Sequence, residues 1–281
     1  MSKSSFRNLI STQSLNSLLQ SEDKVVLLDI RYMPGQTDGY QRYLAGHIVG
    51  ALPLDLARQL ADGAAVGRGS APLPNPASLQ SDLHSLGVND DSTIVVYDDT
   101  NGAPAARAWW VLRWAGLQSV LVLDGGLAAW RQDGFAIDRQ IVSPSGGGNV
   151  TVRVGALPHV TIDDVDAADR LLLDARGKAA FVAGRIPHAQ SLPAATLQKA
   201  DGRLLPHDEL RRRLIASGIE PGREAIATCG GGVAASYLVL AAEEAGLQLA
   251  LHAGSFSEWT EAGKPVATGE PSVAASSREV V

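Results

Sequence analysis

Cysteine is almost absent from this sequence: Cys229 is the only one among 281 residues, so no disulfide can form within the chain. No apolar run approaches the ~18 residues that span a bilayer. The amino terminus, "MSKSSFRNLISTQSLNSLLQ", lacks the apolar core of ~7–15 residues found in a secretory signal. No Cys-x-x-Cys or paired-histidine spacing indicates a zinc site. These absences predict a cytoplasmic protein with no membrane partner and no metal.

Positive charge is also scarce. Lys and Arg number 24 against 30 Asp and Glu, which gives a net charge of −6. Because binding to nucleic acid needs clustered basic side chains that neutralise phosphates, this balance argues against a nucleic-acid partner. A hydrophobic content of 45% is ample for packed cores, and the chain is longer than the ~100–200 residues of a typical domain. We therefore expect a globular protein of two domains.

The chain contains an internal repeat. The first half has "VVLLDIR", "AGHIVGALP", "TIVVYDD" and "LVLDGGLAAW" in that order, and the second half has "RLLLDAR", "AGRIPHAQSLP", "EAIATCG" and "ALHAGSFSEW". The separation between matched landmarks shrinks steadily along the chain, as expected for two copies of one domain that differ by loop deletions. In this alignment Asp98 of the first copy matches Cys229 of the second. One copy therefore keeps a reactive side chain at this position, and the other keeps only the scaffold.

The segment "IVSPSGGGNVTVRVGA", residues 141–156, is rich in Ser, Pro and Gly at its start, which is typical of a linker. We place the first domain at 1–142, the linker at 143–156 and the second domain at 157–269. Residues 270–281 are expected to form a disordered tail.

Both halves alternate short apolar runs with helical patterns. Runs such as "VVLLDI", "TIVVYD" and "VLVLD" carry Val, Ile and Leu at consecutive positions, which is typical of strands buried on both faces. Segments 103–116 and 233–246 each end at a glycine, as helices with a C-terminal glycine cap do. This alternation predicts an α/β fold in each half, with a central parallel sheet flanked by helices on both faces. Such sheets bind ligands beyond the carboxyl ends of their strands, which is where Cys229 lies.

Three glycines follow Cys229 in "IATCGGGVAAS". Because glycines carry no side chain, their successive backbone N–H groups can curve around one point, and the next helix directs the positive end of its dipole there. Both effects favour a thiolate over a thiol, and the thiolate is the nucleophilic form of cysteine. They would equally stabilise a second, anionic sulfur attached to Cys229. The loop is therefore suited to holding a persulfide.

In this order the motifs resemble the tandem-domain rhodanese-like sulfurtransferases, which include thiosulfate and 3-mercaptopyruvate sulfurtransferases. The resemblance rests on "DIR", "GHIVGA", "PLPNP", "VVYDD", "AARAWWVLR", "VLDGGLAAW", "DAR", "CGGGVAAS" and "GSFSEW", and covers about residues 8–267. It implies two rhodanese-like domains, the first catalytically silent and the second active. It also implies a catalytic cysteine that opens a substrate-binding loop. Here that loop is Cys229, Gly230, Gly231, Gly232, Val233 and Ala234.

The resemblance implies a ping-pong reaction that needs no cofactor and no metal. The Cys229 thiolate takes the outer sulfur of 3-mercaptopyruvate or thiosulfate, and the resulting persulfide passes it to cyanide, a thiol or a protein acceptor such as a thioredoxin-like protein. The uncharged loop is closer to that of enzymes that prefer 3-mercaptopyruvate than to the basic loop of enzymes that prefer thiosulfate.

The sequence departs from the family pattern at two positions. Gly231 stands where the 3-mercaptopyruvate enzymes have a serine, and Ala180 stands where the family has a second donor-binding arginine. An anionic donor needs a positive partner, because an unpaired buried charge is unfavourable. The candidate cations are Arg176, which matches the first family arginine, and the nearby Lys178 and Arg185.

Each candidate has an alternative role. Arg176 could pair with a carboxylate that holds its strand end, Lys178 could be solvated on a loop, and Arg185 could be an ordinary surface residue. Tyr32 matches an aromatic residue that lines the cleft between the domains in the family, and simple packing at the interface is the alternative. The remaining large aromatics, Trp109, Trp110, Trp130 and Trp259, are assigned to cores or to the interface.

Three other functions fit the sequence less well. A cysteine phosphatase needs an arginine six residues after the cysteine, and that residue is Ala235. A dinucleotide site would need an acidic residue at the end of the next strand, which reads "LQLALHAGS". A persulfide carrier or binding module with little turnover of small molecules is the alternative that stays open.

Overall fold

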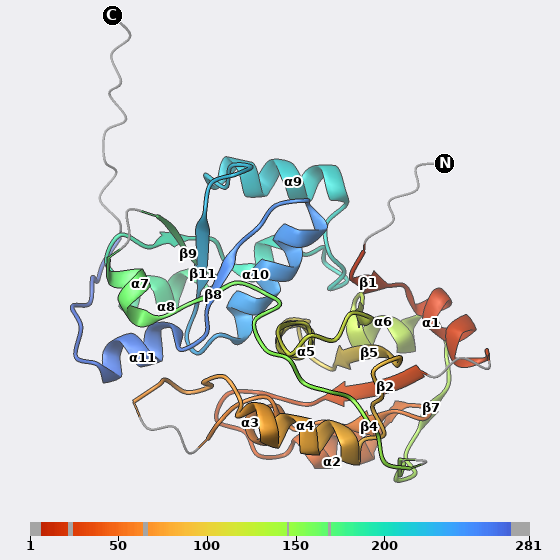
Figure 1. Cartoon of the computed structure of the whole chain (residues 1–281). Helices are drawn as coiled ribbons and strands as arrows, with labels where there is room; N and C mark the ends of the chain where they lie inside the picture. Colours follow the sequence, from red (N-terminus) through yellow and green to blue (C-terminus); the bar gives the residue numbers. More distant parts are fainter. Residues whose placement is uncertain (1–6, 22–24, 64–66, 145, 168–169, 271–281) are drawn as a thin grey trace, which may run out of the picture.

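The computed structural model describes residues 7–21, 25–63, 67–144, 146–167 and 170–270. Two parallel five-stranded sheets form the centres of two domains (Figure 1). The first sheet contains β1 (Leu9–Ile10), β2 (Val25–Ile30), β4 (Leu52–Pro53), β5 (Thr93–Asp98) and β6 (Val120–Leu123). The second contains β8 (His159–Val160), β9 (Leu171–Asp174), β10 (Gln190–Ser191), β11 (Ala225–Thr228) and β12 (Ala250–His252). A short antiparallel pair, β3 (His47–Ile48) and β7 (Ile137–Asp138), is attached to the first domain.

The two sheets have the same strand order. It is β1-β6-β5-β2-β4 in the first and β8-β12-β11-β9-β10 in the second, so each strand has a counterpart in the other domain. The register gives the same match as the sequence repeat. Asp29 of β2 pairs with Tyr97 and Asp174 of β9 pairs with Thr228, so the next residues along the chain, Asp98 and Cys229, occupy equivalent positions.

Helices cover both faces of each sheet, as predicted. Those of the first domain are α1 (Thr12–Leu19), α2 (Gly39–Ala45), α3 (Leu56–Gln59), α4 (Pro76–Ser85), α5 (Ala103–Trp114) and α6 (Gly126–Gln132). Those of the second are α7 (Ile162–Asp166), α8 (Lys178–Ala183), the 3-10 helix η1 (Ala194–Leu197), α9 (His207–Ala216), α10 (Val233–Glu244) and α11 (Ser255–Glu261). On the outer face of each sheet a separate small core forms, around Trp130 of α6 in the first domain and Trp259 of α11 in the second.

One continuous core joins the inner faces of the two domains. Helices α5 and α10 lie side by side between the two sheets, and the residues buried around them form a single apolar cluster (Figure 1). Trp109 and Trp110 of α5 are fully buried in it, as the core or interface assignment predicts. Because α5 and α10 both begin at the carboxyl ends of central strands, this packing brings the two strand-to-helix loops close to the domain interface.

The segment that connects the domains follows the surface of the first one. Backbone hydrogen bonds join Gly148 N–H to the His84 carbonyl at 2.8 Å, Arg153 N–H to the Ala115 carbonyl at 2.8 Å and Gly155 N–H to the Trp114 carbonyl at 2.9 Å. The described part of the predicted linker is thus tied to the domain that precedes it. Of the predicted tail, residues 271–281 lie outside the described residues. Within the described ranges, no helix is long and apolar enough to cross a membrane.

Candidate active site

Cys229 lies directly after β11, at the start of the loop that leads into α10. Gly232 ends this loop as the N-cap of α10, with φ +81°, a left-handed conformation that favours glycine. Its backbone N–H donates a hydrogen bond to Cys229 Sγ over 3.1 Å. The helix therefore directs its dipole and one amide hydrogen at the sulfur, and both stabilise negative charge there. The glycine pattern predicted several successive amides around this point, and among the backbone amides of the described residues only that of Gly232 donates to Sγ.

A strained serine holds the other side of the cysteine. Cys229 N–H donates to Ser255 Oγ at 3.1 Å, and Ser255 Oγ donates to the His252 carbonyl at 2.8 Å. Ser255 has φ +54°, which is unfavourable for a residue with a side chain. The equivalent residue of the first domain is Gly126, with φ +57°. A serine in a position that the other copy gives to glycine indicates that its hydroxyl is needed beside Cys229.

The first domain covers the loop. Ser70 Oγ lies so near Gly231 that a Cβ on this glycine would collide with it, and Ser70 N–H donates to Ser257 Oγ at 2.9 Å. A hydroxyl of the first domain therefore lies against the loop at Gly231. Cys229 is 2% exposed, whereas Gly230 and Gly231 are half-buried. The sulfur itself is therefore covered, and the partly exposed stretch of the loop begins at the next residue, Gly230.

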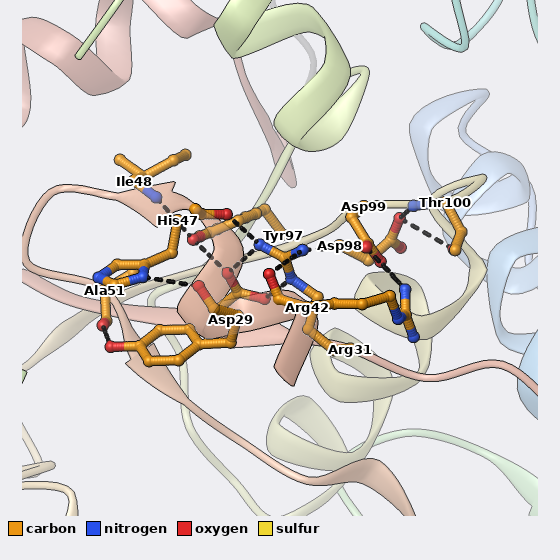
Figure 2. Close-up of polar contacts among 12 residues, drawn as sticks. Asp29, Arg31, Arg42, His47, Ile48, Ala51, Tyr97, Asp98, Asp99 and Thr100 are labelled. Atoms are coloured by element: carbon orange, nitrogen blue, oxygen red, sulfur yellow. Dashed lines mark hydrogen bonds and ion pairs between the residues drawn. The ribbon is translucent and has the colours of Figure 1, made fainter. Parts of the chain in front are cut away.

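Arg176 lies beside the loop but is fully engaged. Its Nη2 donates to Asp174 at 2.6 Å and to the Gly184 carbonyl at 2.8 Å, and its guanidinium stacks on the Phe256 ring. Arg31, its counterpart in the first domain, makes the same two kinds of contact: it donates to Asp29 (Figure 2), and it donates to the Gly46 carbonyl. Since the cysteine-free copy has the same arrangement, these contacts serve to hold the end of the strand.

The structure places Tyr32 near Cys229. It does not bring the predicted cations Lys178 and Arg185 to the cysteine loop. Burial raises the pKa of the Tyr32 hydroxyl, and the charge of nearby Cys229 raises it further. Lys178 pairs with Glu270 at 3.0 Å and its side chain is 74% exposed. Arg185 stacks on Phe181 and donates to the Gly269 carbonyl at 2.6 Å. Neither set of contacts reaches the cysteine loop.

In the first domain the equivalent loop is filled by its own carboxylate. Asp98 is buried and accepts hydrogen bonds from the backbone N–H groups of Thr100 at 2.9 Å, Gly102 at 3.1 Å and Ala105 at 2.9 Å (Figure 2 shows the first of these). Gly102, with φ +77°, caps α5 as Gly232 caps α10, but this loop is one residue longer. In both copies the backbone N–H of the capping glycine thus donates to the side chain that follows the central strand.

We expect Asp98→Ala to weaken the fold without changing sulfur chemistry. Removing the carboxylate leaves buried N–H groups without an acceptor, which lowers the free energy of unfolding by about 1–3 kcal/mol. Thermal unfolding and the steady-state rate of sulfur transfer measure the two effects. Thr100→Ala is the matched control, because it keeps the carboxylate and its backbone partners. A loss of activity as large as that of a cysteine variant would contradict the assignment of a silent first domain.

Three further residues that were not predicted as site residues lie around the loop: Ser70, Ser255 and Arg107 of α5, of which Arg107 and Ser255 stand within the motifs "AARAWWVLR" and "GSFSEW". The structural signal for Arg107 is its complete burial, and a Cβ on Gly232 would lie 3.2 Å from its Nη1. Behind the loop, His252 contacts Thr228 Oγ1 at 3.4 Å and Glu258 at 3.1 Å. No group of three or more His, Cys, Asp or Glu side chains suited to a metal occurs in the described ranges.

Comparisons with known proteins agree with this geometry. A model of the rhodanese-like domain matches residues 11–133 and again residues 158–262. The chain is 39% identical to a putative thiosulfate sulfurtransferase, SseB, of Mycobacterium tuberculosis, over 93% of this chain and 97% of the relative. It is 38% identical to a probable 3-mercaptopyruvate sulfurtransferase of Pseudomonas aeruginosa, over 93% and 98%. The crystal structure of the 3-mercaptopyruvate sulfotransferase SseA from Escherichia coli superposes with a TM-score of 0.80 at 30% identity, over 89% of this chain and 98% of that one.

Proposed function

Because this chain belongs to the rhodanese-like family and is a sulfurtransferase, as its motifs predict, we propose that it transfers the outer sulfur of 3-mercaptopyruvate or thiosulfate through a persulfide on Cys229. The observation that carries this proposal is the hydrogen bond from Gly232 N–H to Cys229 Sγ at the N-terminus of α10. A backbone donor aimed at sulfur favours the thiolate, which is the attacking form.

The reaction proceeds in two halves. The Cys229 thiolate attacks the outer sulfur of the donor, and an S–S bond forms at Cys229. The electron pair of the broken bond leaves with sulfite, or with the enolate of pyruvate, which takes a proton from solvent. In the second half cyanide or a thiol attacks the outer sulfur and releases the Cys229 thiolate, so no external oxidant or reductant is required.

The charge of the loop favours 3-mercaptopyruvate as the donor. Residues 229–234 carry no charged side chain. Arg176 is neutralised by Asp174, and Lys178 is paired with Glu270. Thiosulfate brings two negative charges to the site, whereas 3-mercaptopyruvate brings one carboxylate, so the loss of solvation is smaller for the second donor.

Steady-state assays with both donors, read as thiocyanate formed from cyanide, test this proposal. We expect turnover with both donors, and a kcat/KM at least about tenfold higher with 3-mercaptopyruvate. A loop without charged side chains compensates poorly for the hydration that the thiosulfate dianion loses when it binds. Intact-protein mass spectrometry after each donor should show the gain of one sulfur atom. A gain of sulfur without turnover would favour a persulfide carrier, and neither sulfur gain nor turnover would reject the proposal.

A further inference from the structure

Arg107 is a fully buried cation with most of its hydrogen-bonding capacity unused. It lies in α5 of the first domain, where its Nη2 donates to the Ala71 carbonyl at 2.9 Å. Its Nε and Nη1 have no hydrogen-bond partner among the described residues. An arginine buried without a counter-ion destabilises the fold, so a role in packing does not account for it.

The unused side of Arg107 faces the cysteine loop of the other domain. Its Nη1 lies 3.2 Å from the position that a Cβ on Gly232 would take. Gly232 is the residue whose N–H points at Cys229 Sγ. Burial lowers the pKa of Arg107 to about 10, while Cys229 and Tyr32 act in the opposite direction. The guanidinium is therefore charged at neutral pH and lies in electrostatic reach of the sulfur.

The pseudo-symmetry of the two domains shows that this placement is specific. Arg107 follows the capping glycine Gly102 at the same spacing at which Tyr237 follows Gly232. Each of these two side chains reaches the capping glycine of the opposite domain. Arg107 Nη1 lies 3.2 Å from the position of a Cβ on Gly232, and Tyr237 Cε2 lies 2.9 Å from that of a Cβ on Gly102. The loop already filled by the Asp98 carboxylate thus receives a neutral tyrosine. The loop that carries cysteine receives a cation.

We propose that Arg107 of the first domain stabilises the negatively charged sulfur carried on Cys229, both as thiolate before attack and as persulfide after it. This inference rests on the sulfur transfer proposed above. Arg107 takes no proton in either half of the reaction. It stabilises negative charge at each stage. That charge lies on Sγ before the attack, on the leaving group as the bond breaks, and on the outer sulfur once the persulfide has formed. The domain without a nucleophile thereby completes the site of the other.

The basic side chains of the second domain near Cys229 are paired with carboxylates of that domain. Arg176, which follows β9, is paired with Asp174, and His252 of β12 contacts Glu258 of α11. Tyr32 of the first domain, which follows β2, is neutral at physiological pH like any ordinary tyrosine, and burial raises its pKa further. Of the described cations that face the loop, Arg107 is the one without a carboxylate partner. Its charge is therefore the one that should act most directly on the sulfur.

The test is the pH profile of alkylation of the full-length protein by iodoacetamide, which reports Cys229 alone because the chain has no other cysteine. In Arg107→Met the pH of half-maximal rate should rise by about one unit or more, because an opposite charge near a thiol favours its ionised form. Arg107→Lys should restore part of the shift. Tyr237→Phe, the matched change on the silent side, should follow the wild-type curve.

Fold integrity is checked by near-ultraviolet circular dichroism, since Trp109 and Trp110 adjoin Arg107. Arg107→Met should keep or raise the melting temperature, because it removes a buried charge without a counter-ion. If it fails to fold, Arg107→Gln, which can still donate to the Ala71 carbonyl, takes its place in the same assay. An unchanged alkylation profile in a folded variant overturns the inference. Because alkylation needs no donor, the measurement stands even if the wild type transfers no sulfur.

Discussion

Replacing Cys229 by serine should reduce sulfur transfer to the uncatalysed background and abolish the gain of one sulfur atom in the intact mass. A serine oxygen fits the same space and can still accept from Gly232 N–H, so the loop keeps its shape. The hydroxyl is, however, a far weaker nucleophile than a thiolate and forms no persulfide. Thiocyanate formation and mass spectrometry after 3-mercaptopyruvate and after thiosulfate measure both losses.

The control for this variant is its stability. Cys229 is buried, but the exchange of sulfur for oxygen leaves almost no cavity, so thermal unfolding should match the wild type within about 1 kcal/mol. Turnover that persists in folded Cys229→Ser would place the nucleophile elsewhere and remove the basis of the proposed reaction.

Two neighbouring glycines should respond very differently to alanine. In Gly232→Ala the new Cβ would collide with the Ala253 carbonyl oxygen and approach Arg107 Nη1 to 3.2 Å, and φ is +81°. We expect a loss of about 1–3 kcal/mol in the free energy of unfolding from the forbidden conformation and the clash. Sulfur transfer should fall at least about a hundredfold, because the amide that faces Sγ is displaced.

Gly230→Ala is the matched control. The nearest atom to its new Cβ is Arg176 Cδ at 3.9 Å, an ordinary contact distance, so the loop can accept the methyl group. Activity within a few fold of wild type is expected, measured in parallel with thermal unfolding. Equal losses in the two variants would show that flexibility of the glycine run, rather than the position of one amide, is what the loop needs.

Much of the scaffold was predictable because each strand and helix is determined by a local pattern. The consecutive apolar residues of "VVLLDI" and "TIVVYD" form β2 and β5 at the predicted positions. The central helices begin at the predicted Ala103 and Val233 and end two residues before their glycines, because the last turn closes on Ala115 and Ala245 as C-caps. The match of Asp98 with Cys229 follows from the repeat and agrees with the register of the sheets.

The electrostatics of the site were less predictable because they depend on contacts between domains. The family pattern directs attention to cations near Arg176 in the sequence, yet Lys178 and Arg185 are held by Glu270 and Gly269. Arg107 lies far from Cys229 in the sequence and reaches it only through the packing of α5 against α10. A signal did exist: in "APAARAWWVLRW" Arg107 interrupts the apolar residues of the first two turns, and its counterpart in the repeat is Tyr237.

The longer loop after Asp98 has a consequence for how the two copies could have diverged. Its extra residue sets Gly102 further along the chain from the strand end than Gly232 is from Cys229, and the backbone N–H groups of Thr100, Gly102 and Ala105 converge on the two oxygens of Asp98. A cysteine at position 98 would therefore present a single sulfur to a loop whose amides are arranged around two oxygens, and it would face neutral Tyr237 where Cys229 faces a cation. Exchange of this one residue would leave the first domain a support for the site of the second.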